Sequence, residues 1–239
     1  MKMNMKNKEI IEKNKKAILL LRLANKAEGK ISVRGTSFIV NSKGLFITAA
    51  HVYNSIPSNE LELLEAQVMN EEVSKGVYNY LSYKVELLEM NKESDTALMR
   101  LLPASDQKNE FAYISPDEFG DPAALQEGDD LLFMGYPLAT ELIGMGFGIT
   151  MTSIHCILSA MKYKGSDHSL HFLMVDTHTN PGVSGSPVFL KESGQVIAMV
   201  SGNVSQAVQS PDQKMVRIPA NIGICQPINH IKEIIKKYE

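Results

Sequence analysis

Three short segments of the chain carry a histidine, an aspartate and a serine in contexts that suit nucleophilic chemistry. His51 follows the apolar run at residues 45–50, Asp95 precedes an apolar stretch, and Ser184 lies in a Gly-Val-Ser-Gly sequence. A hydroxyl is a weak nucleophile at neutral pH, and it needs a base beside it and a carboxylate that orients the base. His51, Asp95 and Ser184 are therefore a candidate hydrolytic triad, with His51 as the base.

The turn around Ser184 could also supply an oxyanion hole. Glycine tolerates tight turns, and such a turn can direct the N–H groups of Gly182 and Ser184 toward one point. Two donors there would hold the oxyanion of a tetrahedral intermediate. Each segment taken alone has an ordinary structural explanation: a Gly/Ser/Pro turn, a histidine after a strand, and an aspartate in a turn. The three together favour the catalytic interpretation.

Bulk composition predicts a folded protein with a buried core. The chain has 239 residues, of which 44% are hydrophobic and 21% charged, enough for one large all-β domain or two smaller packed ones. The net charge is −3, but residues 1–16 carry +4 and residues 232–239 carry +1, so the remainder carries −8. An acidic body argues against nucleic acid as the main partner. The basic N-terminal segment is interpreted as a solvated end.

The cysteines and the hydropathy of the chain indicate which cofactors and which cellular compartment to expect. Cys156 and Cys225 both lie in apolar stretches, which favours two buried free thiols over one disulfide. No metal-binding cysteine spacing is present, and neither a metal nor another cofactor is expected. The first 30 residues contain no usable export signal, and no apolar run reaches the roughly 18 residues of a membrane span. We therefore expect a soluble, cytoplasmic protein without a membrane span.

The periodicity predicts mostly short strands separated by turns, which is typical of a β-sandwich or of β-barrels. Helical patterns are confined to the two ends, where residues 227–238 carry a stripe of isoleucines. Residues 58–76 fit neither period and are expected to form a surface excursion or a long strand. The segment at residues 103–130 is expected to connect two halves. The predicted strands are residues 17–24, 35–40, 44–49, 80–89, 96–102, 131–134, 149–160, 170–175, 187–190, 196–201 and 222–226.

The three motifs, in the order His, Asp, Ser, resemble those of trypsin-like serine peptidases of the chymotrypsin fold. The resemblance extends from about residue 17 to residue 235 and is strongest to the bacterial HtrA/Do-like branch, without its PDZ domain. Residues 35–40 resemble the glycine-containing early strand of that family, residues 135–137 its Gly-Asn-Pro turn, and residues 180–187 its nucleophile motif. That motif ends in Ser-Gly-Ser-Pro, which is similar to the motif of glutamyl-endopeptidase relatives and differs from the usual Ser-Gly-Gly-Pro of the HtrA branch.

This resemblance implies an all-β fold of two packed six-stranded antiparallel β-barrels, chymotrypsin-like, with a C-terminal helix. Residues 1–16 would form a basic N-terminal segment. Residues 17–115 would form the first barrel, which carries His51 and Asp95. Residues 116–239 would form the second barrel, with Ser184 and the closing helix. An extended peptide would bind between the barrels and pair with a strand edge at Ser201, Gly202 and Asn203.

The resemblance further implies a serine endopeptidase that hydrolyses peptide bonds through an acyl-enzyme, acting on a peptide or protein substrate. The alternative is a catalytically silent or partner-activated peptide-binding module of the same fold. By resemblance, His178 and Thr179 lie at the P1 pocket, where they would accept an acidic side chain or a small or apolar one. Val183 replaces the aspartate of trypsin-like zymogens. Activation by N-terminal cleavage is therefore not expected, and substrate, an activating protein partner or local packing would order the turn.

Overall fold

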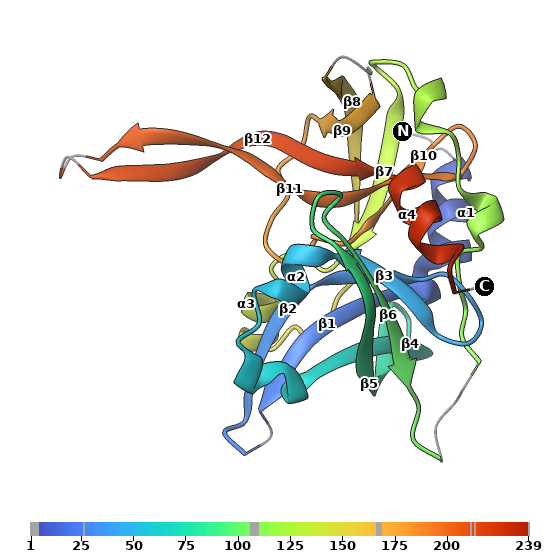
Figure 1. Cartoon of the computed structure of the whole chain (residues 1–239). Helices are drawn as coiled ribbons and strands as arrows, with labels where there is room; N and C mark the ends of the chain where they lie inside the picture. Colours follow the sequence, from blue (N-terminus) through green and yellow to red (C-terminus); the bar gives the residue numbers. More distant parts are fainter. Residues whose placement is uncertain are drawn as a thin grey trace.

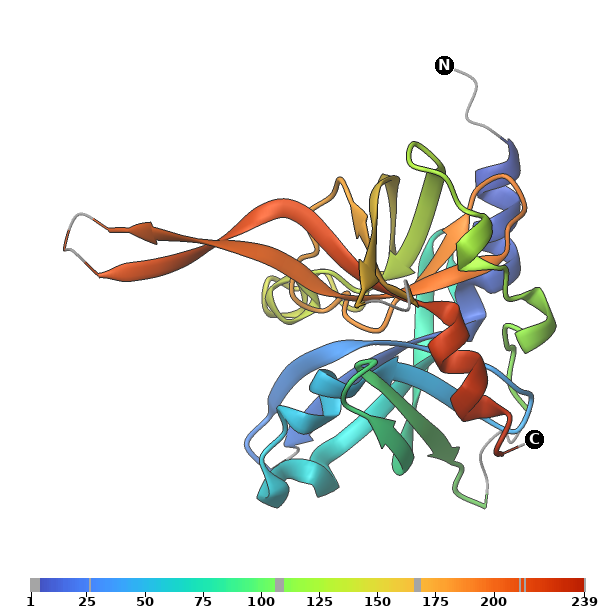
Figure 2. The ribbon, with the colours of Figure 1, turned by 45° about the horizontal axis from the view of Figure 1, so that its top comes forward.

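The computed structural model describes residues 5–25, 27–105, 110–165, 169–210, 212 and 214–238. Within these residues, twelve strands form two closed antiparallel barrels of six strands each. The barrels pack one above the other, and the ends of the chain cover one side of the junction between them (Figures 1 and 2). This architecture confirms the expected all-β fold of two six-stranded barrels.

The first barrel has the strand order β1-β2-β3-β6-β5-β4. Its closure depends on the antiparallel pairing of β1 with both β2 and β4. The strand patterns alternate or are continuously apolar, as expected for strands that cover a core. The bounds are β1 Ile18–Asn25, β2 Lys30–Ile39, β3 Leu45–Ala49, β4 Leu64–Ser74, β5 Val77–Asn91 and β6 Thr96–Leu102.

The second barrel has the order β10-β11-β12-β9-β8-β7. Its strands lie within residues 130–227, and those of the first barrel within residues 18–102, while the exact domain boundaries stay predictions. The bounds are β7 Asp130–Gly135, β8 Thr152–Lys164, β9 Ser169–Val175, β10 Pro187–Leu190, β11 Val196–Gln209 and β12 Met215–Pro227. The helices are α1 Met5–Asn14, α2 Ala50–Asn54, α3 Ala139–Gly144 and α4 Ile228–Ile235, with 3₁₀ turns η1 Lys15–Ala17, η2 Ser58–Leu63, η3 Pro116–Glu118 and η4 Pro122–Ala124.

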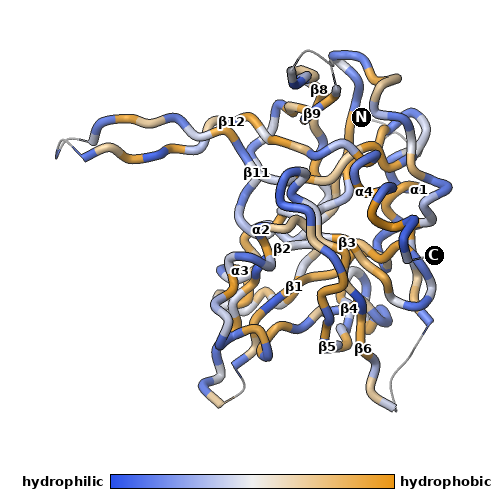
Figure 3. Tube along the Cα trace, in the orientation of Figure 1, coloured by the Kyte–Doolittle hydropathy of each residue, from blue (hydrophilic) through white to orange (hydrophobic). Residues whose placement is uncertain are grey.

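The apolar core of the first barrel is continuous with the junction between the barrels. One buried cluster joins the first barrel to Leu132 and Met134 of β7 and to Met199 of β11. The four isoleucines of α4 belong to the same cluster, so the predicted closing helix seals the junction. A second cluster fills the second barrel. Figure 3 shows apolar residues, in orange, along the strands of both barrels and on α4. A shared core fixes the two barrels relative to each other.

Both cysteines lie in the second barrel with their thiols free and buried, as predicted. Burial raises the pKa of the Cys156 thiol to about 12 and that of Cys225 well above its ordinary value. Neither thiol is therefore ionised at neutral pH, and neither is a candidate nucleophile.

Of the two structures expected for residues 58–76, the long strand is present: this segment contains η2 and β4, and β4 closes the first barrel. Strands β11 and β12, expected at residues 196–201 and 222–226, are longer than predicted. Their additional residues, 202–209 and 215–221, form a hairpin that projects from the second barrel (Figures 1 and 2). We call this hairpin the arm. It was missed because strands exposed on both faces show no alternation of apolar and polar residues.

Candidate active site

The end of β3 and the start of β6 bring His51 and Asp95 together. The chain leaves β3 at Ala49 and enters α2, so that His51 lies in the first turn of this helix. Asp95 occupies the turn before β6 with a left-handed backbone, at φ 48°. Its carbonyl accepts a hydrogen bond from the N–H of Ala50 at 3.0 Å. This hydrogen bond between backbone groups holds Asp95 next to α2.

The two Asp95 carboxylate oxygens bind different atoms of His51. Oδ1 accepts from the His51 backbone N–H at 2.9 Å, and Oδ2 accepts from the ring Nδ1–H at 2.8 Å. With its proton on Nδ1, the ring leaves Nε2 free as a base. The His51 side chain is 49% exposed and that of Asp95 is 19% exposed. The carboxylate is thus shielded while the ring remains accessible to a substrate.

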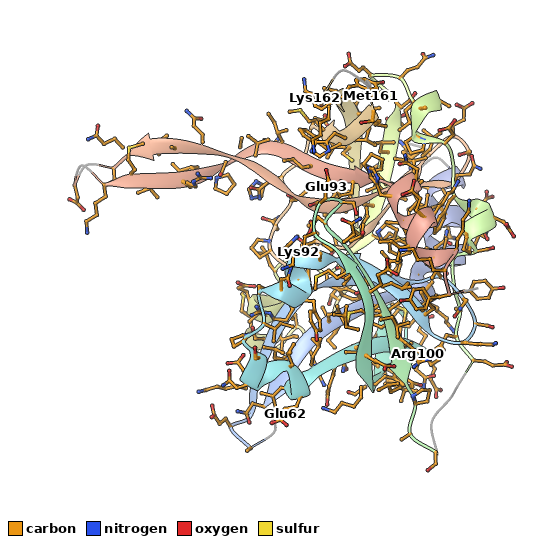
Figure 4. The ribbon with its side chains drawn as sticks, viewed as in Figure 1. Glu62, Lys92, Glu93, Arg100, Met161 and Lys162 are labelled. Carbon is orange, nitrogen blue, oxygen red and sulfur yellow. The ribbon has the colours of Figure 1, made fainter. Side chains whose placement is uncertain are left out.

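Hydrogen bonding keeps Asp95 ionised. Burial alone would raise its pKa, but hydrogen bonds from the His51 ring and from the Ser201 hydroxyl favour the charged form more strongly. Together they hold the pKa of Asp95 below its ordinary value of 3.8. The neighbouring part of this turn is joined to the second barrel, because Glu93 accepts from Lys164 Nζ at 2.9 Å. Figure 4 labels Lys92 and Glu93 in the turn that carries Asp95.

The lowered pKa of Asp95 predicts how stability depends on pH. A carboxylate with a depressed folded-state pKa stabilises the protein fully above its ordinary pKa of 3.8 and loses this effect as pH falls through the lower folded value. Wild type is therefore expected to melt at a higher temperature than Asp95→Asn at neutral pH, with a gap that narrows below pH 3.8. Thermal melts followed by circular dichroism measure this gap. A gap independent of pH would contradict the prediction.

Ser184 lies in a turn that the first barrel holds in place. The Thr36 N–H on β2 donates to the Ser184 carbonyl at 2.8 Å, and its hydroxyl donates to the Gly182 carbonyl at 2.7 Å. The same hydroxyl accepts from the Tyr136 N–H at 3.1 Å. The Thr48 hydroxyl donates to the Thr36 carbonyl at 2.8 Å and thereby helps to fix the backbone of Thr36. A strand of one barrel therefore positions the candidate nucleophile of the other.

The two glycines of this turn are required by their backbone conformation and by the space around them. Gly182 and Gly185 have φ values of 100° and 91°, which side-chain-bearing residues rarely adopt. A Cβ on Gly182 would collide with the Tyr136 carbonyl oxygen. One on Gly185 would collide with the Thr36 carbonyl and would lie 2.6 Å from Thr48 Oγ1. The tight turn that the Gly-Val-Ser-Gly sequence suggested is present.

Gly185→Ala tests this close approach, with Gly128→Ala as its control. Gly128 has a similar φ of 97°, but no atom lies within 4 Å of the place that a Cβ would take there. We expect Gly128→Ala to lose about 1 kcal/mol of unfolding free energy, from backbone strain alone. Gly185→Ala is expected to lose about 4 kcal/mol, because a steric clash adds to the strain. Urea denaturation measures both, and equal losses would contradict the packing described here.

The N–H groups of Gly182 and Ser184 donate to no atom of the described residues. The neighbouring N–H groups are occupied: that of Val183 donates to the Asn180 carbonyl at 3.3 Å, and that of Gly185 to the Val200 carbonyl at 2.7 Å. The Val183 side chain is fully buried in the apolar core of the second barrel. Its packing anchors the turn at the position where a zymogen would carry aspartate.

Ser201 contacts two of the three candidate catalytic residues, Ser184 and Asp95. Its carbonyl accepts a hydrogen bond from Ser184 Oγ at 3.2 Å, and its hydroxyl donates to Asp95 Oδ2. No hydrogen bond joins Ser184 Oγ to the His51 ring among the residues that the structure describes. The sequence suggested Ser201 only as a backbone partner for substrate. Its hydroxyl has the further role of holding the carboxylate, which no local pattern indicated.

Of the remaining candidate site residues, Gly202 and Asn203 belong to β11, and Thr179 is hydrogen-bonded to both. Thr179 is 4% exposed and donates its hydroxyl to the Gly202 carbonyl at 2.7 Å. The Asn203 side-chain amide donates to the Thr179 carbonyl at 3.2 Å. His178 is partly exposed. The structure therefore ties the segment before the nucleophile turn to the strand edge, and the Thr179 hydroxyl is already engaged.

Comparisons with known proteins identify the family that the chain resembles. The family model described as a trypsin-like peptidase domain matches residues 35–199. A relative in Chlamydia pneumoniae, named as a DegP-like periplasmic serine endoprotease, is 28% identical over 188 residues, covering 74% of this chain and 31% of that protein. A relative of the same name in Chlamydia trachomatis is 27% identical over 179 residues, covering 72% and 29%. The chain thus spans about a third of the length of these relatives.

The comparison with solved structures supports the fold. The crystal structure of Deg5 superposes with a TM-score of 0.64 at 14% sequence identity, covering 96% of this chain and 91% of that one. The names of the chlamydial relatives contradict the cytoplasmic location expected from the sequence. That expectation was wrong because it depended on the absence of an export signal, and such an absence does not identify a compartment. No helix in the described part of the chain is long and apolar enough to cross a membrane.

Proposed function

Because the chain belongs to the trypsin-like peptidase domain family, we propose that it is a serine endopeptidase with Ser184 as nucleophile, His51 as general base and Asp95 as the group that orients the base. The observation that supports this most strongly is the set of contacts from Asp95 to His51 and, through Ser201, to Ser184. The periplasmic names of the chlamydial relatives support the same compartment for this chain.

Catalysis in this proposal begins with a rotation of the Ser184 hydroxyl from the Ser201 carbonyl toward His51. His51 Nε2 takes the hydroxyl proton while Oγ attacks the peptide carbonyl carbon. The carbonyl electron pair moves onto oxygen, which the free N–H groups of Gly182 and Ser184 stabilise. The C–N bond then breaks, the leaving amine takes the proton from His51, and an ester to Ser184 remains.

Deacylation repeats the sequence with water as nucleophile. His51 takes a proton from the water as it attacks the ester carbonyl, and the same two N–H groups receive the second oxyanion. The Ser184–acyl bond breaks, and the proton returns to Ser184 Oγ. Asp95 remains ionised throughout, because its hydrogen bonds from His51 and Ser201 lower its pKa, and it stabilises the imidazolium that forms in each half-reaction. No metal or other cofactor has a role in this proposal.

Substrate binding is proposed at two places. Ser201, Gly202 and Asn203 would pair with the substrate backbone, and His178 would lie at the P1 pocket. The engaged Thr179 hydroxyl would shape the wall of that pocket rather than bind a charged group. This arrangement favours an acidic P1 residue or a small or apolar one. A peptide library in which arginine or lysine is strongly preferred at P1 would contradict the pocket assignment.

A fluorophosphonate probe tests the proposed function directly. This reagent phosphonylates a serine only where a base and an oxyanion hole activate it. We expect mass spectrometry to find the label on Ser184 and a peptide substrate to slow its attachment. Protein that takes no label would favour the alternative, a silent peptide-binding module. Labelling that appears only after a protein partner is added would identify a partner-activated enzyme.

A further inference from the structure

The arm is a two-stranded ribbon with two open edges. The pairing of β10 with β11 ends at Met199, and the pairing of β9 with β12 begins at Gly223. Beyond these points β11 and β12 pair with each other as far as Gln209 and Met215. Among the described residues, no third strand joins this part of the ribbon. Figures 1 and 2 show it extending away from both barrels.

The hydrogen bond at the tip of the arm determines which residue pairs along it are hydrogen-bonded and which are not. The Ser210 N–H donates to the Lys214 carbonyl at 2.8 Å, which makes these two residues a hydrogen-bonded pair. Hydrogen-bonded and non-hydrogen-bonded pairs alternate along an antiparallel ladder. Residues of non-hydrogen-bonded pairs direct their N–H and C=O groups outward, to the open edges. Along the arm these pairs are Gln209 with Met215, Ala207 with Arg217, and Ser205 with Pro219.

The two edges differ in their protection against further pairing. Natural edge strands are blocked by proline and by charged residues. On the β12 edge, Pro219 lacks the outward N–H and Arg217 carries a charge. On the β11 edge, residues 202–209 read Gly-Asn-Val-Ser-Gln-Ala-Val-Gln, with neither proline nor charge. The sequence therefore protects one edge and leaves the other able to accept a strand.

The open edge starts at the proposed active site. Ser201, immediately before the arm, accepts the hydrogen bond from Ser184 Oγ at 3.2 Å. In the acyl-enzyme, the substrate segment before the cleaved bond stays attached to Ser184, whereas the other segment leaves past His51. The acyl segment is thus anchored at the root of the open edge. A two-stranded hairpin is only marginally stable in water, and a third strand would add hydrogen bonds and cover apolar surface.

The apolar surface of the arm is available for such a strand. On β11, Val204 and Val208 are partly exposed and Ala207 is exposed, and a strand added to this edge would cover these side chains. Met215, Val216 and Ile218, which are 68%, 45% and 52% exposed, lie one strand further away on β12. In Figure 4 the side chains of the arm extend on both sides of the ribbon. The β11 edge offers eight residues, a length of about 26 Å at the usual strand rise of about 3.3 Å per residue.

We propose that the arm is a docking edge for the acyl side of an extended polypeptide substrate, which adds to β11 as a third strand along residues 202–209. This inference rests on the proposed function. It identifies the substrate class as unfolded or extended polypeptide with several residues before the cleaved bond. Short peptides reach only the root of the edge and are expected to be poor substrates.

The test compares peptides that share one cleaved sequence, chosen from the library profile. One carries about three residues before the scissile bond and one about nine, which is long enough to reach the far end of the edge at about 3.3 Å per residue. A third peptide has the added residues after the bond instead. We expect extension on the acyl side to lower KM about tenfold, through several hydrogen bonds partly offset by the ordering of the peptide. The same extension after the bond is expected to have no effect.

Two proline substitutions facing each other across the arm separate its edges. Ala207→Pro removes an outward N–H from the β11 edge, and Arg217→Pro removes one from the β12 edge, while neither removes a ladder hydrogen bond. We expect Ala207→Pro to eliminate the advantage of the long peptide and Arg217→Pro to retain it. Equal effects of the two variants, or no dependence on acyl-side length, would overturn the proposal. Thermal melts of both variants show whether the barrels remain folded.

A binding measurement keeps this test independent of catalysis. Fluorescence anisotropy of the fluorescein-labelled peptides is measured with full-length protein that carries Ser184→Ala. Long peptides that bind about tenfold more tightly than short ones, through the same several hydrogen bonds, would support the docking edge even if no hydrolysis occurs. Length-dependent binding without hydrolysis by the wild type would contradict the proposed function and leave the docking edge supported. A concentration-dependent dimer in sedimentation, dissolved by Ala207→Pro, would assign the edge to a second copy of the chain and overturn the proposal.

Discussion

Ser184→Ala is expected to lower kcat/KM for peptide hydrolysis by about a millionfold, to a residual rate that binding and the oxyanion N–H groups alone support. The substitution removes the proposed nucleophile, and no other hydroxyl takes its place in the turn that Thr36 holds. Steady-state hydrolysis of a fluorogenic peptide measures the loss. Peptide affinity, measured by anisotropy, is expected to change little, because the substitution leaves the backbone of the turn in place.

Ser186→Ala is the matched control for this prediction. Ser186 lies two residues further along the same loop, is fully buried, and its hydroxyl has no hydrogen-bond partner in the described structure. Removing an unsatisfied buried hydroxyl costs little or stabilises the protein. Ser186→Ala is therefore expected to retain wild-type turnover. Comparable activity in Ser184→Ala and wild type, or loss in Ser186→Ala alone, would show that the nucleophile is assigned wrongly.

Asp95→Asn is expected to lower kcat/KM by about ten thousandfold, with a largely unchanged structure. An asparagine amide near His51 Nδ1 favours the tautomer that carries its proton on Nε2, and that nitrogen then cannot accept the Ser184 proton. Asparagine would also fail to stabilise the imidazolium. The same fluorogenic assay measures the loss, and it should appear mainly in kcat because no substrate contact is removed.

Glu93→Gln provides the control for Asp95→Asn, because it removes a carboxylate from the same turn. Glu93 forms a solvent-exposed ion pair with Lys164 at 2.9 Å, and such pairs contribute about 0–1 kcal/mol to stability. Activity within about twofold of wild type is expected, since this carboxylate contacts no candidate catalytic residue. An Asp95→Asn variant with activity within about tenfold of wild type would remove Asp95 from the proposed mechanism.

The sequence predicted the features that local patterns encode. His51 and Ser184 lie in short segments whose apolar strand and paired glycines are visible without any knowledge of the fold. The isoleucine stripe of α4 and most strands of both barrels have a clear period for the same reason. The turn glycines were assigned correctly because a left-handed backbone leaves a direct compositional signal.

The contacts that join distant segments could not be predicted in this way. Thr36 and Thr48 are buried polar residues on otherwise apolar strands, which is a signal that they bind something, but not what they bind. The Ser201 hydroxyl reaches Asp95 across 106 residues of sequence. The arm was missed because its strands have no buried face, and burial is what produces a readable strand pattern.

The dependence of the Ser184 turn on Thr36 has a consequence for how the protein matures. The hydrogen bond from Thr36 to Gly182 spans 146 residues of the chain, and contacts of such long range form late because loop closure must precede them. A chain that has completed only its N-terminal half holds His51 and Asp95 but no nucleophile, and an isolated C-terminal half lacks the strand that shapes its turn. In the proposed mechanism, hydrolytic activity therefore requires both halves to be folded and docked. A partly folded copy of the chain would then be unable to hydrolyse other copies.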